Sequence, residues 1–282
     1  MKFAAFTVML PDLSPERAVT ALAQAGYDGV EWRVTTIDSE RLNETPSFWG
    51  NNFCTLEPTL ENADRVRKLT REAGLELSNL GTYLSPGNLA VVEKAMQFAE
   101  RAGAPSLRVN AESYKGDYHA SFERSLEFYR EVEKLAKHYK VRALVETHQG
   151  LITPSASLAH CFVSHFDPQH VGVIYDPGNM VLEGFETYLM GLQLLGPYLA
   201  HVHLKNAAFT RPENGGVWQP RWTPLEDGVV NFKDVLRSLI KVGYDGWLVM
   251  EDFSAARASL ETLTHNITFI KNLLVEVQNE ET

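Results

Sequence analysis

Residues 243–251 read Gly243-Tyr244-Asp245-Gly246-Trp247-Leu248-Val249-Met250-Glu251, and they show a unit that recurs along this chain. A glycine that ends a helix leads directly into a short apolar strand, and the strand ends in a carboxylate. The same sequence pattern occurs near the other end of the chain, as Gly26-Tyr27-Asp28-Gly29-Val30-Glu31-Trp32. A helix that stops at a glycine and continues into a strand is typical of a parallel sheet.

Eight short apolar runs are candidate strands, and helical stretches separate nearly all of them. The runs cover residues 3–10, 29–33, 75–80, 106–110, 142–147, 171–176, 200–205 and 247–251. The clearest helices cover residues 121–139 and 232–242, and an earlier helix begins at Ser14-Pro15 and stops at Gly26. This alternation over the whole length predicts an α/β fold with one parallel sheet.

The chain length and the sequence after the first strand distinguish between two α/β architectures. Eight strands in 282 residues fit a single (β/α)8 TIM barrel that covers residues 1–282 as one domain. The alternative, a doubly wound sheet, carries a glycine-rich phosphate loop after its first strand, but residues 9–13 read Met-Leu-Pro-Asp-Leu. We therefore expect the barrel, with residues 35–56 as a long loop that forms a lid over the carboxyl ends of the strands.

Composition and charge exclude several classes of partner. Lys and Arg total 26 against 36 Asp and Glu, and this net charge of -10 disfavours nucleic acid and anionic membranes. No apolar run approaches the roughly 18 residues of a membrane span. Pro11, Asp12 and Glu16 interrupt the apolar N-terminus before the core of a signal peptide could form. The two cysteines, Cys54 and Cys161, show no disulfide or metal-site spacing. We expect a soluble, cytoplasmic protein.

Four late strands each end in a residue that can bind a metal ion. These residues are Glu146, Asp176, His203 and Glu251. The active site of a parallel barrel lies at the carboxyl ends of its strands, so the four side chains are expected to meet there. Three carboxylates and one imidazole suit Mn²⁺, Mg²⁺ or Co²⁺, and zinc is not excluded. A single carboxylate at a strand end is more often the N-cap of the next helix, but four in succession favour a shared site.

Strand alternation extends the candidate site. Alternate residues of a strand share a face, so His148 is expected beside Glu146, and His201 and Lys205 beside His203. A His and a Lys next to a metal ion can polarise a carbonyl group or bind a hydroxyl group. His201 lies deeper in the barrel, and the alternative is a satisfied core histidine.

The earlier strands and the loops supply further candidates. Arg108 shares a face with Asn110 and is expected to bind a polar substrate, with an outward salt bridge as the alternative. Glu31 and Arg33, at the end of the second strand, are weaker candidates. Four aromatic residues in the loops either pack on a sugar ring or form the core of the lid: Trp49, Phe53, Trp218 and Trp222.

Three short motifs and one longer stretch carry a family resemblance. They are Val145-Glu146-Thr147-His148, Tyr175-Asp176-Pro177-Gly178-Asn179, His203-Leu204-Lys205-Asn206, and the stretch from Pro224 through Gly243-Tyr244-Asp245-Gly246 to Glu251. In order and spacing these residues resemble the xylose isomerase-like TIM-barrel superfamily, the sugar phosphate isomerase/epimerase group. The resemblance extends over essentially the whole chain, and it does not specify the substrate.

The resemblance implies an enzyme that uses one divalent metal ion. Glu146, Asp176, His203 and Glu251 would bind the ion, with Mn²⁺ or Mg²⁺ expected and Co²⁺ or Zn²⁺ as alternatives. Glu146 and Glu251 would exchange a substrate proton through a metal-stabilised enediolate, which isomerises or epimerises a ketose-like sugar or polyol. The expected substrate-binding residues are His148, Arg108, Asn179, Lys205 and Arg211, the last in the loop after the seventh strand. A homodimer or homotetramer is implied by analogy.

Two departures from the family pattern keep other functions open. Asn179 stands where the family often has His, and Asn206 stands where Asp is more common. The same motifs also resemble dehydratases of cyclic keto-polyols such as 3-dehydroshikimate or inosose, so a lyase is the second expectation. An endonuclease IV-like repair enzyme is disfavoured by the acidic charge. A barrel that binds a sugar without converting it is a further alternative. The sequence shows no glycine-rich phosphate cradle, which favours a free sugar or polyol.

Overall fold

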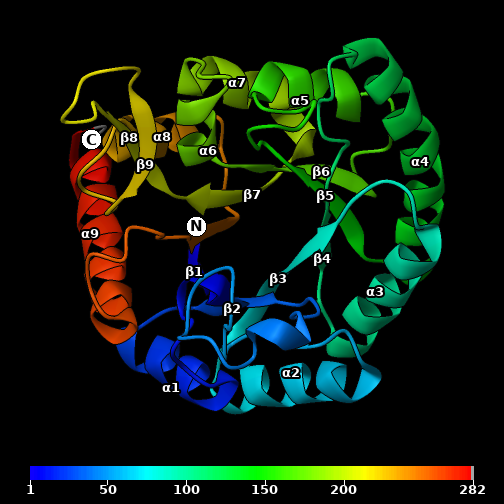
Figure 1. Cartoon of the computed structure of the whole chain (residues 1–282), viewed down its shortest axis with the longest axis horizontal. Coiled ribbons are helices and arrows are strands. Elements are labelled where there is room, and N and C mark those ends of the chain that lie inside the picture. Colours follow the sequence, from blue (N-terminus) through cyan, green and yellow to red (C-terminus); the bar gives the residue numbers. More distant parts are fainter. Residues whose placement is uncertain (281–282) are drawn as a thin grey trace.

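The computed structural model describes residues 1–280, and its central feature is a closed barrel of eight parallel strands. The strands are β1 (Lys2–Phe6), β2 (Gly29–Arg33), β3 (Glu76–Leu84), β4 (Ser106–Val109), β5 (Arg142–Glu146), β6 (Val171–Tyr175), β7 (Leu199–Leu204) and β10 (Trp247–Met250). Around the barrel they follow the order β1-β10-β7-β6-β5-β4-β3-β2, and helices surround them (Figure 1). The predicted (β/α)8 TIM barrel is confirmed.

The helices are those that the sequence pattern requires between parallel strands. They are α1 (Pro15–Ala25), α2 (Leu60–Glu72), α3 (Leu89–Ala102), α4 (Tyr118–Tyr139), α5 (Ala156–Val163), α6 (Pro177–Leu182), α7 (Tyr188–Leu195), α8 (Phe232–Lys241) and α9 (Ser259–Glu280), with short 3-10 helices η1 (Thr7–Met9), η2 (Ser39–Arg41) and η3 (Gly196–Tyr198). The side chain of Ser14 caps α1, and Gly26 ends it in the left-handed conformation at φ 85°, where glycine carries no Cβ penalty. None of the helices among residues 1–280 is both long and apolar enough to cross a membrane.

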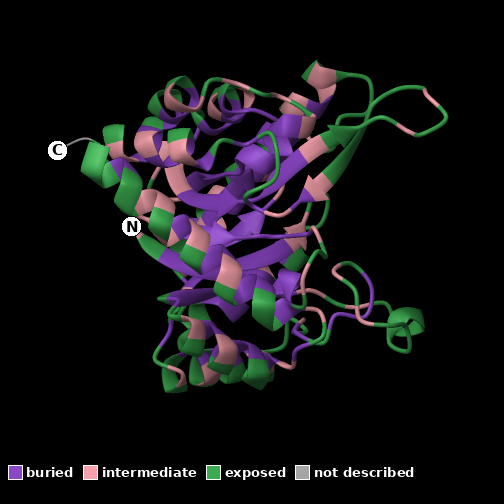
Figure 2. Cartoon of the chain, turned by 90° about the vertical axis from the view of Figure 1, so that its left-hand side faces the viewer, coloured by how far each residue is buried: buried purple, intermediate pink, exposed green. Residues whose placement is uncertain are grey.

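Apolar side chains form two clusters that hold the barrel together. The larger one lies between the strands and the helices, and each of the helices α1 to α9 contributes residues to it. The smaller one comprises Ala4, Phe6, Val8, Val249 and Phe253, and it lies on the opposite face of β1 and β10, inside the barrel. Figure 2 shows this layering, with buried residues on the central strands and exposed residues on the outer helices.

Some element boundaries differ from the prediction. The first strand, expected over residues 3–10, ends at Phe6, because the chain turns into η1. There the hydroxyl of Thr7 accepts a hydrogen bond from the backbone N–H of Arg33 at 2.8 Å. The third strand continues past the expected residue 80 to Leu84, because it shifts register and pairs again with Val109 of β4.

The structure contains a hairpin that the sequence pattern did not predict. Directly after β7, β8 (Asn206–Thr210) and β9 (Gln219–Thr223) pair as two antiparallel strands. Asn206 anchors the return of the chain, because its Nδ2 donates to the carbonyls of Leu225 and Val230 and its Oδ1 accepts from the Val230 N–H. The Asn at this position therefore has a structural role in the fold.

Candidate metal centre

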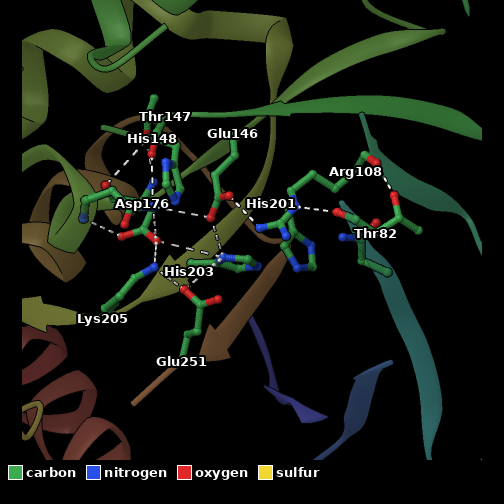
Figure 3. Close-up of polar contacts among 12 residues, drawn as sticks. Thr82, Arg108, Glu146, Thr147, His148, Asp176, His201, His203, Lys205 and Glu251 are labelled. Carbon is green, nitrogen blue, oxygen red and sulfur yellow. Dashed lines mark hydrogen bonds and ion pairs between the residues drawn. The ribbon is translucent and has the colours of Figure 1, made fainter. Parts of the chain in front are cut away.

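The barrel brings together the four residues that the strand-end pattern singled out. Glu146 ends β5, Asp176 follows β6, His203 lies in β7, and Glu251 follows β10. All four are buried, and each offers a ligand atom within 4.8 Å of those of the other three. Figure 3 shows the side chains pointing toward one another. Three carboxylates and an imidazole at this spacing match the donor set of a divalent metal ion.

The imidazole of His203 faces the three carboxylates through one ring nitrogen. Its Nδ1 lies 3.1 Å from Glu146 Oε1, 3.6 Å from Glu251 Oε2 and 3.9 Å from Asp176 Oδ2. Its Nε2 points the other way, 3.1 Å from Glu31 Oε2. The geometry therefore offers Nδ1, and not Nε2, to an ion at the centre of the cluster.

Asp176 combines two roles through its two carboxylate oxygens. Oδ1 accepts from the backbone N–H of Asn179 at 2.9 Å, so Asp176 is the N-cap of α6. Oδ2 lies 2.8 Å from Lys205 Nζ and 2.8 Å from Asn179 Nδ2. The N-cap explanation of this strand end is thus correct for one oxygen, and the other oxygen remains available to the cluster.

Two cations neutralise part of this negative charge. Arg108 points inward, with Nη1 2.5 Å from Glu146 Oε2 and Nε donating to the Thr82 carbonyl at 2.8 Å. The Lys205 ammonium contacts both Asp176 and Glu251. Arg108 therefore forms an inward ion pair and not the outward one that the sequence left open.

Burial and these ion pairs shift the pKa values of the carboxyl groups in different directions. Burial opposes ionisation of Glu146, but Arg108 and His203 outweigh it and hold the pKa of Glu146 well below its usual range. Burial is likewise outweighed at Glu251, where Lys205 and His203 lower the pKa. At Asp176, burial, Glu251 and Glu146 raise the pKa to about 7 in spite of Lys205. A divalent cation would relieve the repulsion between these carboxylates, because it compensates their excess negative charge.

A cavity of about 460 Å³ opens beside the cluster. The predicted site residues that line it are Arg108, Glu146, His148, Asn179, Lys205 and Glu251. Aromatic residues form one part of the lining: Trp49, Tyr83, Trp222 and Phe253. Polar, uncharged side chains form another part, namely Asn110, Ser113 and Gln149. This combination suits a ligand with hydroxyl groups and an apolar ring face.

The predicted lid reaches this cavity through one residue. Trp49, in the 35–56 stretch, packs against Phe253 with ring centroids 4.7 Å apart. Trp222 of β9 also lines the cavity, whereas Phe53 and Trp218 are not among the residues that line it. Of the four loop aromatics, Trp49 and Trp222 therefore lie where they could face a ligand, and contact with a sugar ring stays a prediction.

The remaining predicted substrate residues differ in position. His148 lines the cavity with Nδ1 2.7 Å from the Gln149 carbonyl oxygen, and burial lowers its pKa. Arg211 is exposed, follows β8, and is not among the residues that line the cavity. The structure therefore does not bring Arg211 to the site, and its role in binding substrate stays a prediction.

The structure gives Glu31 a more central position than the sequence predicted, and it adds Asn79 and Tyr83 to the site. Glu31, a weak candidate, accepts from both His201 and His203 in the barrel interior. His201 is the satisfied buried histidine that the alternative explanation described. Asn79 donates to Glu31, and Tyr83 lines the cavity, but neither was singled out. An extended third strand would have revealed both, because Asn79, Gly81 and Tyr83 share one face.

Curated relatives and solved structures are similar to this chain. An inosose dehydratase of Geobacillus thermodenitrificans is 34% identical over 130 residues, a stretch that spans only 42% of each chain. An inosose dehydratase of Yersinia enterocolitica is 24% identical over 258 residues, which cover 86% of this chain and 85% of the relative.

Three solved structures, each 16% identical, share the fold. A D-tagatose 3-epimerase-like protein covers 100% of both chains with a TM-score of 0.76. The IOLI protein with a zinc atom covers 98% of both chains, with a TM-score of 0.73. A xylose isomerase-like TIM barrel protein from Mycobacterium smegmatis in complex with magnesium covers 98% of this chain and 97% of its own, with a TM-score of 0.70. The profile of the family described as xylose isomerase-like TIM barrel matches residues 19–273, and the chain belongs to this family.

Proposed function

We propose that this protein is a divalent-metal-dependent isomerase or epimerase of a ketose-like sugar or polyol. One observation carries the proposal: Glu146 and Glu251 line the same cavity from strands that β6 and β7 separate. Two carboxylates placed apart around one substrate carbon can remove a proton and return one.

Glu146, Asp176, His203 and Glu251 would hold the metal ion. When bound, the ion would supply a Lewis acid that stabilises negative charge on a carbonyl oxygen and on a neighbouring hydroxyl oxygen. The zinc and magnesium in two structural neighbours support a divalent ion, and we propose Mn²⁺ or Mg²⁺ for this chain.

The glutamates would carry the proton. Lys205 and His203 hold the pKa of Glu251 low, so its carboxylate is in the basic form and can remove a proton beside a ketone. Returning a proton to the opposite face of the same carbon inverts it, and returning it to the neighbouring carbon isomerises the sugar. For inversion, Glu146 would first take a proton from solvent, because Arg108 and His203 hold its resting carboxylate ionised, and would then pass it to the opposite face of the carbon. Arg108, which the Thr82 carbonyl fixes in turn, holds Glu146 in place.

The cavity lining supports an uncharged substrate. Among the described residues that line it, the cationic side chains are Arg108 and Lys205, and carboxylates already pair with both. A phosphate group would need cationic or N–H donors of its own. Aromatic faces and amide groups instead suit the C–H and O–H groups of a free sugar or polyol.

A dehydratase of a cyclic keto-polyol is the second candidate, and two observations favour it. Two curated relatives are named inosose dehydratase. Lys205 also lines the cavity in contact with Glu251, so an acid lies beside the base. Glu251 would take the C–H proton, a C=C bond would form as the C–O bond breaks, and Lys205 would donate a proton to the leaving hydroxyl to give water.

Proton exchange with solvent separates the two candidates. The metal-loaded protein is incubated in D₂O with free ketoses and with cyclic keto-polyols, and products are followed by NMR and mass spectrometry. An isomerase or epimerase gives an isomer that carries solvent deuterium. A dehydratase gives a product that has lost one water.

Glu251→Gln tests the proposed base. We expect the variant to fold and to lose at least about 100-fold in exchange rate, the lower range for an acid–base group. Glu72→Gln, the same change at an exposed position of α2, is the control and keeps full activity. Full exchange in Glu251→Gln would overturn the mechanism.

A further inference from the structure

A chain of buried polar side chains crosses the barrel interior next to the metal centre. Ser106 Oγ of β4 donates to Asn79 Oδ1 of β3 at 2.7 Å, and Asn79 Nδ2 lies 3.1 Å from Glu31 Oε1 of β2. From the other side of the barrel, His201 Nε2 and His203 Nε2 of β7 lie 2.8 and 3.1 Å from Glu31 Oε2. All five side chains are buried. Because β1 and β10 separate β2 from β7, Glu31 links strands that do not pair.

The two ring nitrogens of His203 face different carboxylates. Nε2 faces Glu31, and Nδ1 faces Glu146 at 3.1 Å and the rest of the cluster. An imidazole that binds a metal ion through one ring nitrogen is neutral, with one N–H and one lone pair. An ionised Glu31 can only accept, so the N–H belongs on Nε2 and the lone pair on Nδ1 points to the centre of the cluster.

We propose that Glu31 is a positioning residue that keeps the His203 proton on Nε2 and thereby presents Nδ1 to the metal ion. This role rests on the metal centre proposed above. A ligating histidine commonly donates its second ring N–H to a carboxylate, which fixes the tautomer and the ring orientation. Asn79 and His201 hold Glu31 through both of its oxygens, so the carboxylate has one buried position.

The same residues allow a competing arrangement, a second ion held by Glu31, His201 and His203. Their ligand atoms also lie within 4.8 Å of one another. Both groups of ligands share His203, however, and binding an ion at each ring nitrogen would require a fully deprotonated imidazolate. Two N–H donors converging on one carboxylate oxygen at 2.8 and 3.1 Å form ordinary hydrogen bonds. The geometry therefore favours positioning over a second ion.

The first test uses the wild-type protein, so it does not depend on whether a Glu31 variant folds. The protein is labelled with ¹⁵N-histidine and loaded with Zn²⁺, and the His203 signals are assigned by their loss in His203→Gln. We expect zinc on Nδ1 and a proton on Nε2. Zinc on Nε2 would overturn the role of Glu31.

The second test measures metal affinity by chelator competition. Glu31→Gln keeps the size of the side chain but loses the charge, and we expect its Mn²⁺ dissociation constant to rise about 10–100-fold. Glu72→Gln, the same change at an exposed position of α2, is the matched control and stays near the wild-type value. An unchanged constant in Glu31→Gln would contradict the inference.

Ion stoichiometry separates failure of this inference from failure of the proposed function. One ion per wild-type chain, lost in Asp176→Ala/His203→Ala, supports the metal centre whatever Glu31 does. A second ion that is lost in Glu31→Gln would overturn positioning in favour of the competing arrangement. A wild-type protein that binds no divalent ion would overturn both proposals.

Discussion

Lys205 is the residue whose contacts bear most directly on the charge of the metal centre. Its ammonium contacts Asp176 and Glu251 and lies 5.1 and 5.2 Å from the ring centroids of Trp222 and Phe253. Without a metal ion, Lys205 compensates two of the three carboxylates. The stability of the metal-free protein therefore depends on these buried ion pairs.

Lys205→Met should destabilise the metal-free protein and enlarge its response to metal. Removing one partner of a buried ion pair costs about 3–5 kcal/mol, because the other charges stay buried. The four ligands remain, so added Mn²⁺ compensates the unpaired buried charge, and we expect a larger rise in melting temperature than in wild type. The difference between the melting temperatures in EDTA and in excess Mn²⁺ measures this response. Lys68→Met, on the exposed side of α2, should behave as wild type. Equal responses in both variants would contradict the account.

Asp176 should make the metal-free protein less stable as pH rises. Its pKa is raised from 3.8 to about 7, first by burial and then by Glu251 and Glu146. The folded state then binds more protons than the unfolded state between these values, so stability falls as pH rises through them. Melting temperatures from about pH 5 to pH 8, compared between wild type and Asp176→Asn, isolate this contribution. A wild-type curve parallel to that of the variant would exclude it.

At the scale of elements, strand ends were predictable and contacts across the barrel were not. The apolar runs of β5, β6, β7 and β10 each lead to an ionisable residue, and parallel strands place such residues at one end of the barrel. The contact of Glu31 with His201 and His203 depends on how the barrel closes, which no single strand encodes. The β8–β9 hairpin was missed because Pro220 and a long connection weaken its strand pattern.

The start of α6 shows how closely two elements approach at the site. A Cβ at Gly178 would lie 2.4 Å from the carbonyl oxygen of Lys205, a backbone atom that cannot move independently of β7. Because Asp176 caps α6, the position of this helix is coupled to that of a metal ligand. Glycine is therefore required here for a close approach.

Gly178→Ala should lower both stability and metal affinity. Overpacking at a well-packed contact costs about 1–3 kcal/mol, and the displaced helix would pull on Asp176. Urea unfolding measures the first effect, and chelator competition with Mn²⁺ measures the second. A variant that loses stability but binds Mn²⁺ as well as wild type would show that α6 does not position Asp176.

In the whole molecule, the site spans both halves of the barrel. The four candidate ligands come from β5, β6, β7 and β10, which are consecutive around the barrel. Glu31, Asn79 and Ser106 continue the polar contacts into β2, β3 and β4. The large apolar cluster between strands and helices surrounds this interior and does not involve the ligands. The fold should therefore survive without metal, although less stably.

Metal removal tests this separation of fold and site. An ion that binds only the folded state stabilises it by about 2.7 kcal/mol at a free concentration 100 times its dissociation constant. Each kcal/mol shifts the melting temperature of a domain of this size by about 2–4 °C, so we expect a loss of roughly 5–10 °C on chelation. Circular dichroism should show an intact α/β spectrum before melting in EDTA. Asp176→Ala/His203→Ala should show no such shift, and a chelated wild-type protein that is unfolded at room temperature would mean that the ion, and not the apolar core, holds the barrel together.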